Sequence, residues 1–304
     1  MVNITHKATT LRKAVAIATI NVSSRQTIEA VEQRKVPKGD VFEFARAAGL
    51  LAIKKTSDAI PDCHPLPVEF AAITFQTENL SIIISVEVHT IYKTGVEVEA
   101  MHGAAITALV IYDMLKPIDK AVEIGRIRLE KKTGGKSDHS AQSNRELKCA
   151  VIVCSDSISK GINQDHSGKA IIAHLEKYKL KCDRYEIIPD DAAKIGLLAK
   201  GLANDGFDLL IFTGGTGISP TDVTPEALKA LFTKELPGVS EVMRQYGQQR
   251  TPYSMLSRSV AGFINNTLAV ALPGSKNAVE ECMTAIFPHI LHVFDVASGS
   301  RHGQ

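Results

Sequence analysis

The sequence has 304 residues, of which 44% are hydrophobic and 22% charged, with a formal net charge of +2. This length predicts about two domains, and the composition is typical of a globular protein. The nearly balanced charge argues against a nucleic-acid or membrane-surface role, and the sequence has no uninterrupted apolar run of about 18 residues to span a membrane. Five cysteines without a CxxC pair, after a start that lacks a signal-like apolar core, predict a reduced cytoplasmic protein.

The first half mixes helical and strand patterns without a regular alternation between them. Residues 39–56 repeat apolar positions at helical spacing, and two segments rich in β-branched residues, 68–76 and 80–92, predict a hairpin. A long helix over 97–116 ends at Pro117, and a further strand follows over 122–132. This order predicts an α+β, ferredoxin-like domain with helices on one face of a largely antiparallel sheet.

A polar segment separates the two halves. Residues 133–147, TGGKSDHSAQSNREL, show no periodicity and are rich in Gly, Ser, Asp, Gln and Asn. We predict a first domain over 1–138, a linker over 139–147 and a second domain over 148–304. Gly134, Gly135 and Lys136 are also placed to close over a site in the first domain.

The second half alternates short apolar strands with helices. The predicted strands are 150–155, 184–189, 208–215 and 268–274. The predicted helices are 167–178, 195–203, 225–232, about 237–246, and one long final helix over 275–296. Strands that end in Gly-rich turns before helices predict a three-layer α/β domain with a mainly parallel sheet.

A glycine-rich loop, FTGGTGISPTDVTPEA, occupies residues 212–227 between a strand and a helix. Gly214, Gly215 and Gly217 allow close backbone approach, and a helix N-terminus attracts an anion. Thr224 is expected to cap that helix, with Pro225 at its first position. The loop is neither a Walker loop nor GxGxxG, and the alternative is that its glycines only turn the chain.

Acidic side chains follow the predicted strands of this half. Asp156, Asp190 and Asp191 come directly after strands, and Asp222 lies inside the glycine-rich loop. The carboxyl ends of parallel strands are where open α/β sheets bind ligands. A carboxylate beside an anion-binding loop is unfavourable unless a metal ion or a proton-transfer role compensates its charge.

The second half resembles the molybdopterin-binding family that includes molybdopterin adenylyltransferases. The matching stretches are CSDSISKG, IIPDDA, FTGGTGISPTDVTPEA, PGVSEVMRQ, SRSVAG and LPGSKNAVEEC. The resemblance implies transfer of AMP from Mg-ATP to molybdopterin, with Asp190 and Asp222 as the catalytic and Mg²⁺-positioning carboxylates. It implies that the pterin phosphate is held by Gly214, Gly215, Thr216, Gly217, Ser275 and Lys276. Some members of this family only bind molybdopterin, so a binding or oligomerisation module is the alternative.

The first half carries a second set of charged candidates. Asp113 and Lys116 stand three apart on the predicted helix and share a face, which is also typical of an ordinary ion pair. Cys63 and His64 lie together in a DCHP turn, but one Cys–His pair has too few ligands for a metal. The remaining candidates are Lys38, Lys54, Lys55, Asp62, Glu97 and Glu99.

The first half resembles the cyclic pyranopterin monophosphate synthase accessory proteins through KGDVFEFARAAG, AIPDCHPLP, KTGVEVEAM, ALVIYDMLK and IGRIRLEKKTGGKS. The resemblance implies conversion of cyclised dihydro-GTP to cyclic pyranopterin monophosphate with release of pyrophosphate, without a tightly bound cofactor. Such proton transfers suit a lysine of lowered pKa, so Lys38 and Lys116 are the acid/base candidates and Asp113 the catalytic carboxylate. The expected triphosphate contacts are Lys54, Lys55 and His64, and the expected ligand-lining residues are Asp62, Cys63, His64, Val98 and Glu99.

The spacing along the long helix predicts a site shared between subunits. Fourteen steps of about 1.5 Å separate Glu99 from Asp113 by roughly 21 Å, which is too far for one small-molecule pocket in one chain. We therefore expect a symmetric homo-oligomer, and the two resemblances imply three-fold symmetry. The expected partners are otherwise small-molecule pterins and nucleotides, with neither nucleic acid nor membrane.

Overall fold

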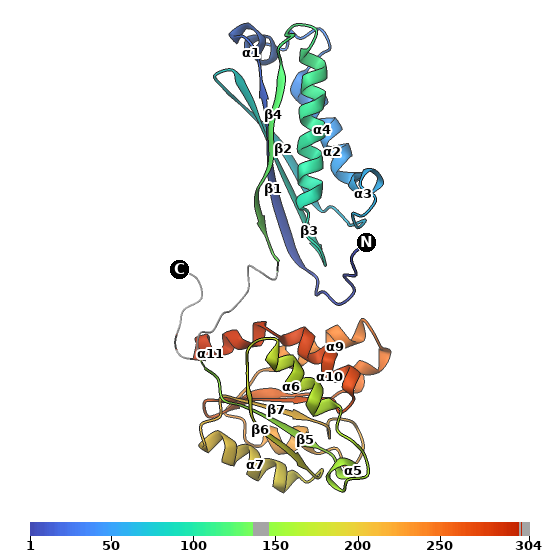
Figure 1. Cartoon of the computed structure of the whole chain (residues 1–304), viewed down its shortest axis with the longest axis vertical. Helices are drawn as coiled ribbons and strands as arrows, with labels where there is room; N and C mark the ends of the chain where they lie inside the picture. The colour runs from blue at the N-terminus through green and yellow to red at the C-terminus, as the bar shows by residue number, and fades with distance from the viewer. Residues whose placement is uncertain (136–145, 298, 300–304) are drawn as a thin grey trace. The chain divides into compact units, whose positions relative to one another are not determined.

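The computed structural model describes residues 1–135, 146–297 and 299 (Figure 1). The chain divides into two compact units, Met1–His139 and Ser140–Gln304. Residues 139–145 of the predicted linker, and Lys136, lie outside the described residues.

A four-stranded antiparallel sheet in the order β2-β3-β1-β4 forms the base of the first unit. Its strands are β1 (Thr10–Asn21), β2 (Phe70–Glu78), β3 (Ser81–Tyr92) and β4 (Glu123–Thr133). Its helices are α1 (Arg25–Glu32), α2 (Val41–Lys54), α3 (Thr56–Ala59) and α4 (Glu97–Leu115), of which α2 and α4 cover one face of the sheet (Figure 1). The predicted α+β, ferredoxin-like fold is confirmed.

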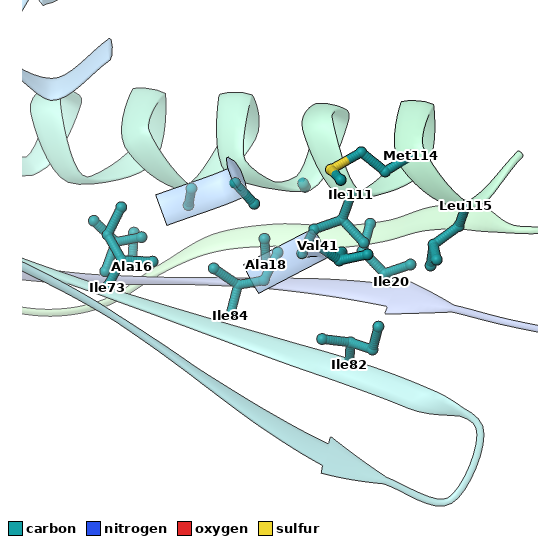
Figure 2. Packing of buried hydrophobic residues seen from close by; sticks show 14 of the residues in the cluster. Ala16, Ala18, Ile20, Val41, Ile73, Ile82, Ile84, Ile111, Met114 and Leu115 are labelled. Carbon is teal, nitrogen blue, oxygen red and sulfur yellow. The ribbon is translucent and has the colours of Figure 1, made fainter. Parts of the chain in front are cut away.

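The core of this unit lies between α4 and the sheet. Along β1 every second side chain from Ala14 to Ile20 is buried, as expected of a strand with one covered face. Figure 2 shows the packed side chains Ala16, Ala18, Ile20, Val41, Ile73, Ile82, Ile84, Ile111, Met114 and Leu115. Burying each of the larger ones contributes about 1.5–3 kcal/mol to stability, so this layer holds α4 firmly on the strands.

Glycines allow α2 and α4 to approach closely. A Cβ on Gly103 would lie 2.5 Å from Cγ1 of Ile53, and one on Gly49 would lie 2.1 Å from Oγ1 of Thr107. Helix α4 is the one described helix that is long and apolar enough to cross a membrane, and half of the span is buried inside the unit. Its apolar composition therefore fits a core helix packed on two sides.

The second unit contains a six-stranded sheet in the order β6-β5-β7-β10-β9-β8, in which the first four strands are parallel. The strands are β5 (Cys149–Cys154), β6 (Cys182–Ile188), β7 (Leu209–Thr213), β8 (Lys234–Glu235), β9 (Ala261–Ile264) and β10 (Thr267–Leu272). The α-helices are α5 (Asp156–Ser159), α6 (Ser167–Glu176), α7 (Ala192–Asn204), α8 (Thr224–Lys229), α9 (Pro237–Gln248), α10 (Lys276–Ile286) and α11 (His292–Ala297). Two 3₁₀ segments, η2 (Pro252–Leu256) and η3 (His289–Leu291), complete it.

Two buried clusters lie on opposite faces of this sheet. One joins the sheet to α6, α9 and α10, and the other joins it to α7 and α8 (Figure 1). The predicted three-layer, mainly parallel α/β fold is confirmed. The single final helix predicted over 275–296 is wrong, because α10 ends at Ile286, just before the Phe287–Pro288 bond. Proline has no amide hydrogen to continue the helical ladder and restricts the residue before it.

Candidate functional sites

Asp113, near the end of α4, lies between two lysines. Lys38 Nζ donates to Asp113 Oδ2 at 2.6 Å and to its backbone carbonyl at 2.9 Å. Lys116 Nζ lies 2.7 Å from the other carboxylate oxygen, Oδ1. Lys38 reaches this position from the loop before α2, where Asp40 caps the helix by accepting from the amide of Glu43. The three predicted catalytic residues of the first domain are thus brought together.

These contacts set the ionisation of the cluster. Hydrogen bonds from Lys116 and then Lys38 lower the pKa of Asp113 to about 2. The hydrogen bond to Asp113 in turn raises the pKa of Lys116. The expectation of a lowered lysine pKa therefore does not hold for Lys116 within one chain, because the adjacent carboxylate favours the ammonium form.

A second cluster gathers at the start of α4, around the buried Glu99. Cys63 Sγ donates to Glu99 Oε1 at 3.4 Å, while Glu99 Oε2 is buried with no hydrogen-bond partner in the part of the chain that the structure describes. Burial raises the pKa of Glu99, and burial together with the nearby Glu99 charge raises the pKa of Cys63 to about 11. A buried carboxylate with a free oxygen suits a hydrogen bond from a bound ligand.

The N-terminal residues lie against the DCHP turn. The amino group of Met1 is 2.6 Å from Asp62 Oδ1, and His64 Nε2 is 2.8 Å from the carbonyl of Val2. Val98 is exposed at the start of α4. Lys54 and Lys55 are exposed at the end of α2, where Lys55 Nζ lies 3.0 Å from Asp58.

A basic cleft of about 170 Å³ lies beside this second cluster, and the sequence analysis anticipated only part of its lining, namely Gly135 and the candidate Glu97. Its cationic lining residues are Lys7, Arg12, Lys13, Lys93 and Lys132. One carboxylate, Glu97, also lines it and lies 3.7 Å from Lys132 Nζ. Gly134 closes on β1 so tightly that a Cβ there would lie 1.7 Å from the carbonyl of Leu11, and the next residue, Gly135, lines the cleft. The sequence feature that could have indicated this cleft was Lys93, which directly precedes the Thr94-Gly95 pair of the matched KTGVEVEAM motif.

The candidates of the second unit gather at one sheet edge. Asp156 follows β5, Asp190 follows β6, the glycine-rich loop follows β7, and the Ser275 turn follows β10. These four strands are parallel neighbours, so their carboxyl ends meet. Gly274 touches Gly214 directly, since its Cβ would lie 3.3 Å from the Cα of Gly214. The predicted gathering of these residues is therefore observed.

Asp190 has an incomplete set of partners. Its Oδ2 accepts from the amide of Asp156 at 3.1 Å, and Asp156 Oδ1 accepts from the amide of Asp190 at 3.3 Å. The other oxygen, Asp190 Oδ1, is buried with no partner among the described residues. Burial, and then the charges of Asp156 and Asp222, raise the pKa of Asp190. This carboxylate lacks a compensating cation within the described part of the unit.

The Thr224 hydroxyl faces the same space beside Gly215 as Asp190 Oδ1, which corrects its predicted role as a helix cap. Val223 occupies the N-cap position of α8, and Thr224 Oγ1 is buried without a hydrogen bond of normal geometry to any residue that the structure describes. Burial raises the pKa of Cys154 to about 12, and the nearby Thr224 hydroxyl only partly opposes this effect. A Cβ on Gly215 would lie 2.4 Å from Thr224 Oγ1 and 2.8 Å from Asp190 Oδ1. The glycine leaves room for two unused oxygens to meet a ligand.

The loop that carries Asp222 is held by Arg258, a residue to which the sequence analysis gave no role. Arg258 Nε donates to the carbonyl of Gly217 and Nη2 to the carbonyl of Asp222, both at 2.6 Å. The same guanidinium pairs with Glu226 of α8, and the Arg258 amide donates to Thr216. Asp222 Oδ2 accepts from the amide of Ser219 at 2.8 Å. The sequence feature that could have identified Arg258 was the matched SRSVAG stretch, which contains it.

The predicted phosphate-holding residues at the end of β10 are exposed. Ser275 caps α10 by accepting from the amide of Ala278, and Lys276 Nζ lies 3.8 Å from Glu280. No group of three or more His, Cys, Asp or Glu side chains able to hold a metal occurs in the part of the chain that the structure describes. A cation here would therefore draw on one or two carboxylates and on its substrate.

Comparisons with known proteins match each unit separately and the chain as a whole. The MoaC family model matches residues 1–135, and the model described as probable molybdopterin binding domain matches residues 150–292. A molybdenum cofactor biosynthesis bifunctional protein from Chlorobaculum tepidum is 38% identical over 99% of this chain and 96% of its own length. A protein of the same description from Synechococcus elongatus is 34% identical over 100% and 99%. A cyclic pyranopterin monophosphate synthase from Listeria welshimeri is 46% identical over 45% of this chain and 86% of its own length.

Proposed function

Because the chain belongs to the family of bifunctional molybdenum cofactor biosynthesis proteins, along whose whole length it aligns, we propose that each unit catalyses one step of that synthesis. The first unit converts cyclised dihydro-GTP to cyclic pyranopterin monophosphate and releases pyrophosphate. The second binds molybdopterin and transfers AMP to it from Mg-ATP. We also place the protein in the cytoplasm, where its five free cysteines stay reduced.

The Asp113 cluster supports the first activity most directly. Two ammonium groups within 3 Å of one carboxylate form a preorganised set of charges. When substrate arrives, Lys38 and Lys116 serve as proton donors and stabilise negative charge on the reacting phosphate. Asp113 orients both lysines until then, and its hydrogen bond raises the pKa of Lys116.

The other half of this site lies at the opposite end of α4. The Glu99 cluster and the basic cleft provide a buried hydrogen-bond acceptor and a set of cations, which suit the purine-derived ring and the triphosphate respectively. Glu99 and Asp113 are 14 residues apart on one continuous helix, roughly 21 Å. We therefore propose that one subunit supplies the Lys38–Asp113–Lys116 cluster and another supplies the Glu99 cluster of the same site.

The observation that carries the second activity is Asp190 Oδ1, which is buried beside Gly215 without a partner among the described residues. The residues present fit a magnesium ion, because Asp190 Oδ1 is buried, uncompensated and directed into space that a side chain at Gly215 would fill. Mg²⁺ is usually held by one or two carboxylates together with substrate phosphates. When bound, it neutralises phosphate charge and favours attack at phosphorus.

The other residues of this edge position the reactants. The Gly214 amide donates to the carbonyl of Leu272, so the amides that follow it, from Gly215 to Gly217, are the ones we assign to the terminal phosphate of molybdopterin. Arg258 fixes the shape of that loop. A phosphate oxygen of molybdopterin attacks the α-phosphorus of ATP, the bond from this phosphorus to the bridging oxygen breaks, and pyrophosphate leaves. Asp222 is held over Gly217, where a Cβ would lie 2.8 Å from its Oδ2, and orients the reacting phosphate.

Each activity is tested by giving the full-length protein one substrate at a time. With cyclised dihydro-GTP we expect cyclic pyranopterin monophosphate and pyrophosphate. With molybdopterin, Mg²⁺ and ATP we expect adenylylated molybdopterin and pyrophosphate, identified by mass spectrometry. Binding of molybdopterin without AMP transfer would instead support a binding module, and neither binding nor transfer would leave oligomer contacts as the role of the second unit.

A further inference from the structure

A cleft of about 320 Å³ lies in the second unit between α8, the start of α9 and the antiparallel strands β8 and β9. Neither Asp190 nor the Gly214–Gly217 loop lines it, and no step of the AMP transfer described above uses it. Its volume is at the lower end of small-molecule sites, which span roughly 300–1,000 Å³. Its charged lining residues are Glu226, Lys229, Glu235, Arg244 and Arg258. Such a lining suits a charged ligand better than an apolar ring.

Two of the three cations in the cleft are open to a ligand. Arg258 is already engaged by Glu226 and by the glycine-rich loop. Lys229 is exposed in the last turn of α8 and makes no ion pair with any residue that the structure describes. Arg244 is partly buried, and its Nη1 donates to the carbonyl of Ser259 through a long contact of 3.4 Å, so its other N–H groups remain for a ligand oxygen.

A buried hydroxyl lines the same space. Ser240, in the first turn of α9, is 5% exposed, and its side chain makes no hydrogen bond with any described residue. Buried hydroxyls normally have a partner, so this one is suited to a ligand atom. No side chain caps α9, and Pro237, its first residue, also borders the cleft. The positive end of the helix dipole therefore adds to the lysine and arginine charges.

The sum of these charges favours an anion. Three cations face two carboxylates in the lining, and one of these carboxylates, Glu226, is compensated by Arg258. The other, Glu235, is exposed on the two-residue strand β8. A ligand with two or more negative charges gains more from Lys229, Arg244 and the helix terminus than it loses to one exposed carboxylate.

We propose that this cleft binds a small phosphate anion, with Lys229 and Arg244 as its cations and the Ser240 hydroxyl as a further donor. Pyrophosphate is the phosphate anion that the protein itself produces, since both proposed reactions release it. That source of the ligand rests on the proposed function, whereas the affinity of the cleft for pyrophosphate does not.

The test titrates the full-length protein with inorganic pyrophosphate by calorimetry, without Mg²⁺ or nucleotide. Lys229→Met and Ser240→Ala should each weaken binding about 5-fold to 10-fold, because each removes one contact to a charged ligand. The glycine-rich loop is intact in both variants, so any pyrophosphate bound there contributes equally to all titrations. Methionine and alanine are good helix formers, and thermal unfolding without ligand verifies that both variants are folded.

Two controls define the specificity of the cleft. Lys200→Met is the matched variant, because Lys200 is exposed on α7 and does not line the cleft, and it should bind pyrophosphate like wild type. Malonate, a small dicarboxylate of lower charge, should bind wild type about 10-fold more weakly than pyrophosphate does.

Equal affinity for pyrophosphate in wild type, Lys229→Met and Ser240→Ala would overturn the inference, because the anion would then bind elsewhere. An equal loss in Lys200→Met, or malonate binding as tight as that of pyrophosphate, would also overturn it. AMP transfer is measured separately. A wild type that forms no adenylylated product but binds pyrophosphate through Lys229 and Ser240 retains this anion site, whereas one that transfers AMP and shows no effect of either variant on pyrophosphate binding does not have it.

Discussion

The central carboxylates of the two units have opposite electrostatic surroundings and opposite pKa shifts. Asp113 is half exposed, lies between two lysines of its own chain, and has a pKa lowered to about 2. Asp190 is partly buried, has acidic neighbours instead of cations, and has a raised pKa. One oxygen of Asp190 has no partner in the described structure, whereas both oxygens of Asp113 face an ammonium group.

This difference indicates what each site still requires. The charge at Asp113 is compensated within the chain, so substrate can bind there without a resident metal ion. The charge at Asp190 is not compensated, and burial without a partner makes the ionised form costly until a cation arrives. We therefore propose that the second site needs a divalent ion with its nucleotide, whereas the first needs a second subunit only because Glu99 lies at the other end of α4.

The largest expected effect comes from removing the uncompensated charge. Asp190→Asn should lower AMP transfer by about two to three orders of magnitude, because the carboxylate that we assign to Mg²⁺ is lost. Asp222→Asn should act in the same direction. The neighbouring Asp191→Asn is the control, since asparagine caps α7 as well as aspartate does. Rates come from product formation under saturating ATP and Mg²⁺.

The same variant has an opposite effect on stability. The raised pKa of Asp190 means that ionisation destabilises the fold, and this loss grows as pH rises from 3.8 through the folded-state value. At neutral pH, without Mg²⁺, Asp190→Asn should therefore unfold at an equal or higher temperature than wild type. A clearly lower unfolding temperature would mean that Asp190 is paired in the free protein and would end the contrast with Asp113.

A smaller loss is expected from the carboxylate that has its own cations. Asp113→Asn should reduce formation of cyclic pyranopterin monophosphate about 100-fold, because Lys38 and Lys116 lose the group that orients them. Glu43→Gln is a matched control, since Glu43 and Arg46 form an ion pair at the same helical spacing on α2. If both variants lose the same activity, the cluster is an ordinary surface ion pair.

Mixed oligomers test whether the first site is shared. Glu99→Ala and Asp113→Ala are each expected to be inactive alone. When the two variants are unfolded and refolded together, about a quarter of wild-type activity should return, because half of the pairs are mixed and each mixed pair has one intact site. No recovery in verified mixed oligomers, or full activity in an isolated monomer, would place the whole site within one chain.

The fold was largely predictable where apolar residues follow a clear period. The strand predicted over 80–92 and the helix predicted over 97–116 correspond closely to β3 and α4. The central strand β1 was not predicted from the sequence. Ala14, Ala16 and Ala18 occupy most of its buried positions, and alanine has a low propensity for strands. The short antiparallel strands β8 and β9 were missed for a related reason, since their lengths give too few alternations to detect.

Site residues were predicted correctly where the fold of the backbone fixes their position. They were not predicted where their role depends on which hydrogen-bond partner the side chain reaches. Residues directly after parallel strands, such as Asp190, had to meet at one edge. Spacing could not show that Thr224 turns inward instead of capping its helix, or that Arg258 reaches the carbonyls of Gly217 and Asp222 from about 40 residues away. Such contacts depend on rotamers and on chain segments brought together only by folding.

The smallest effect concerns the ionisation of Asp113 itself. Because its pKa is lowered, the lysine contacts stabilise the fold above the ordinary value of 3.8, and this contribution is lost as pH falls through about 2. Lys116→Met removes the largest cause of the shift and should move the pKa of Asp113 back towards 3.8, with a smaller move for Lys38→Met. Carbon-detected NMR titration of the aspartate carboxyl groups measures both. Equal values in wild type and both variants would show that the lysines do not compensate Asp113 in solution, so that its site, like that of Asp190, would need a cation from outside the chain.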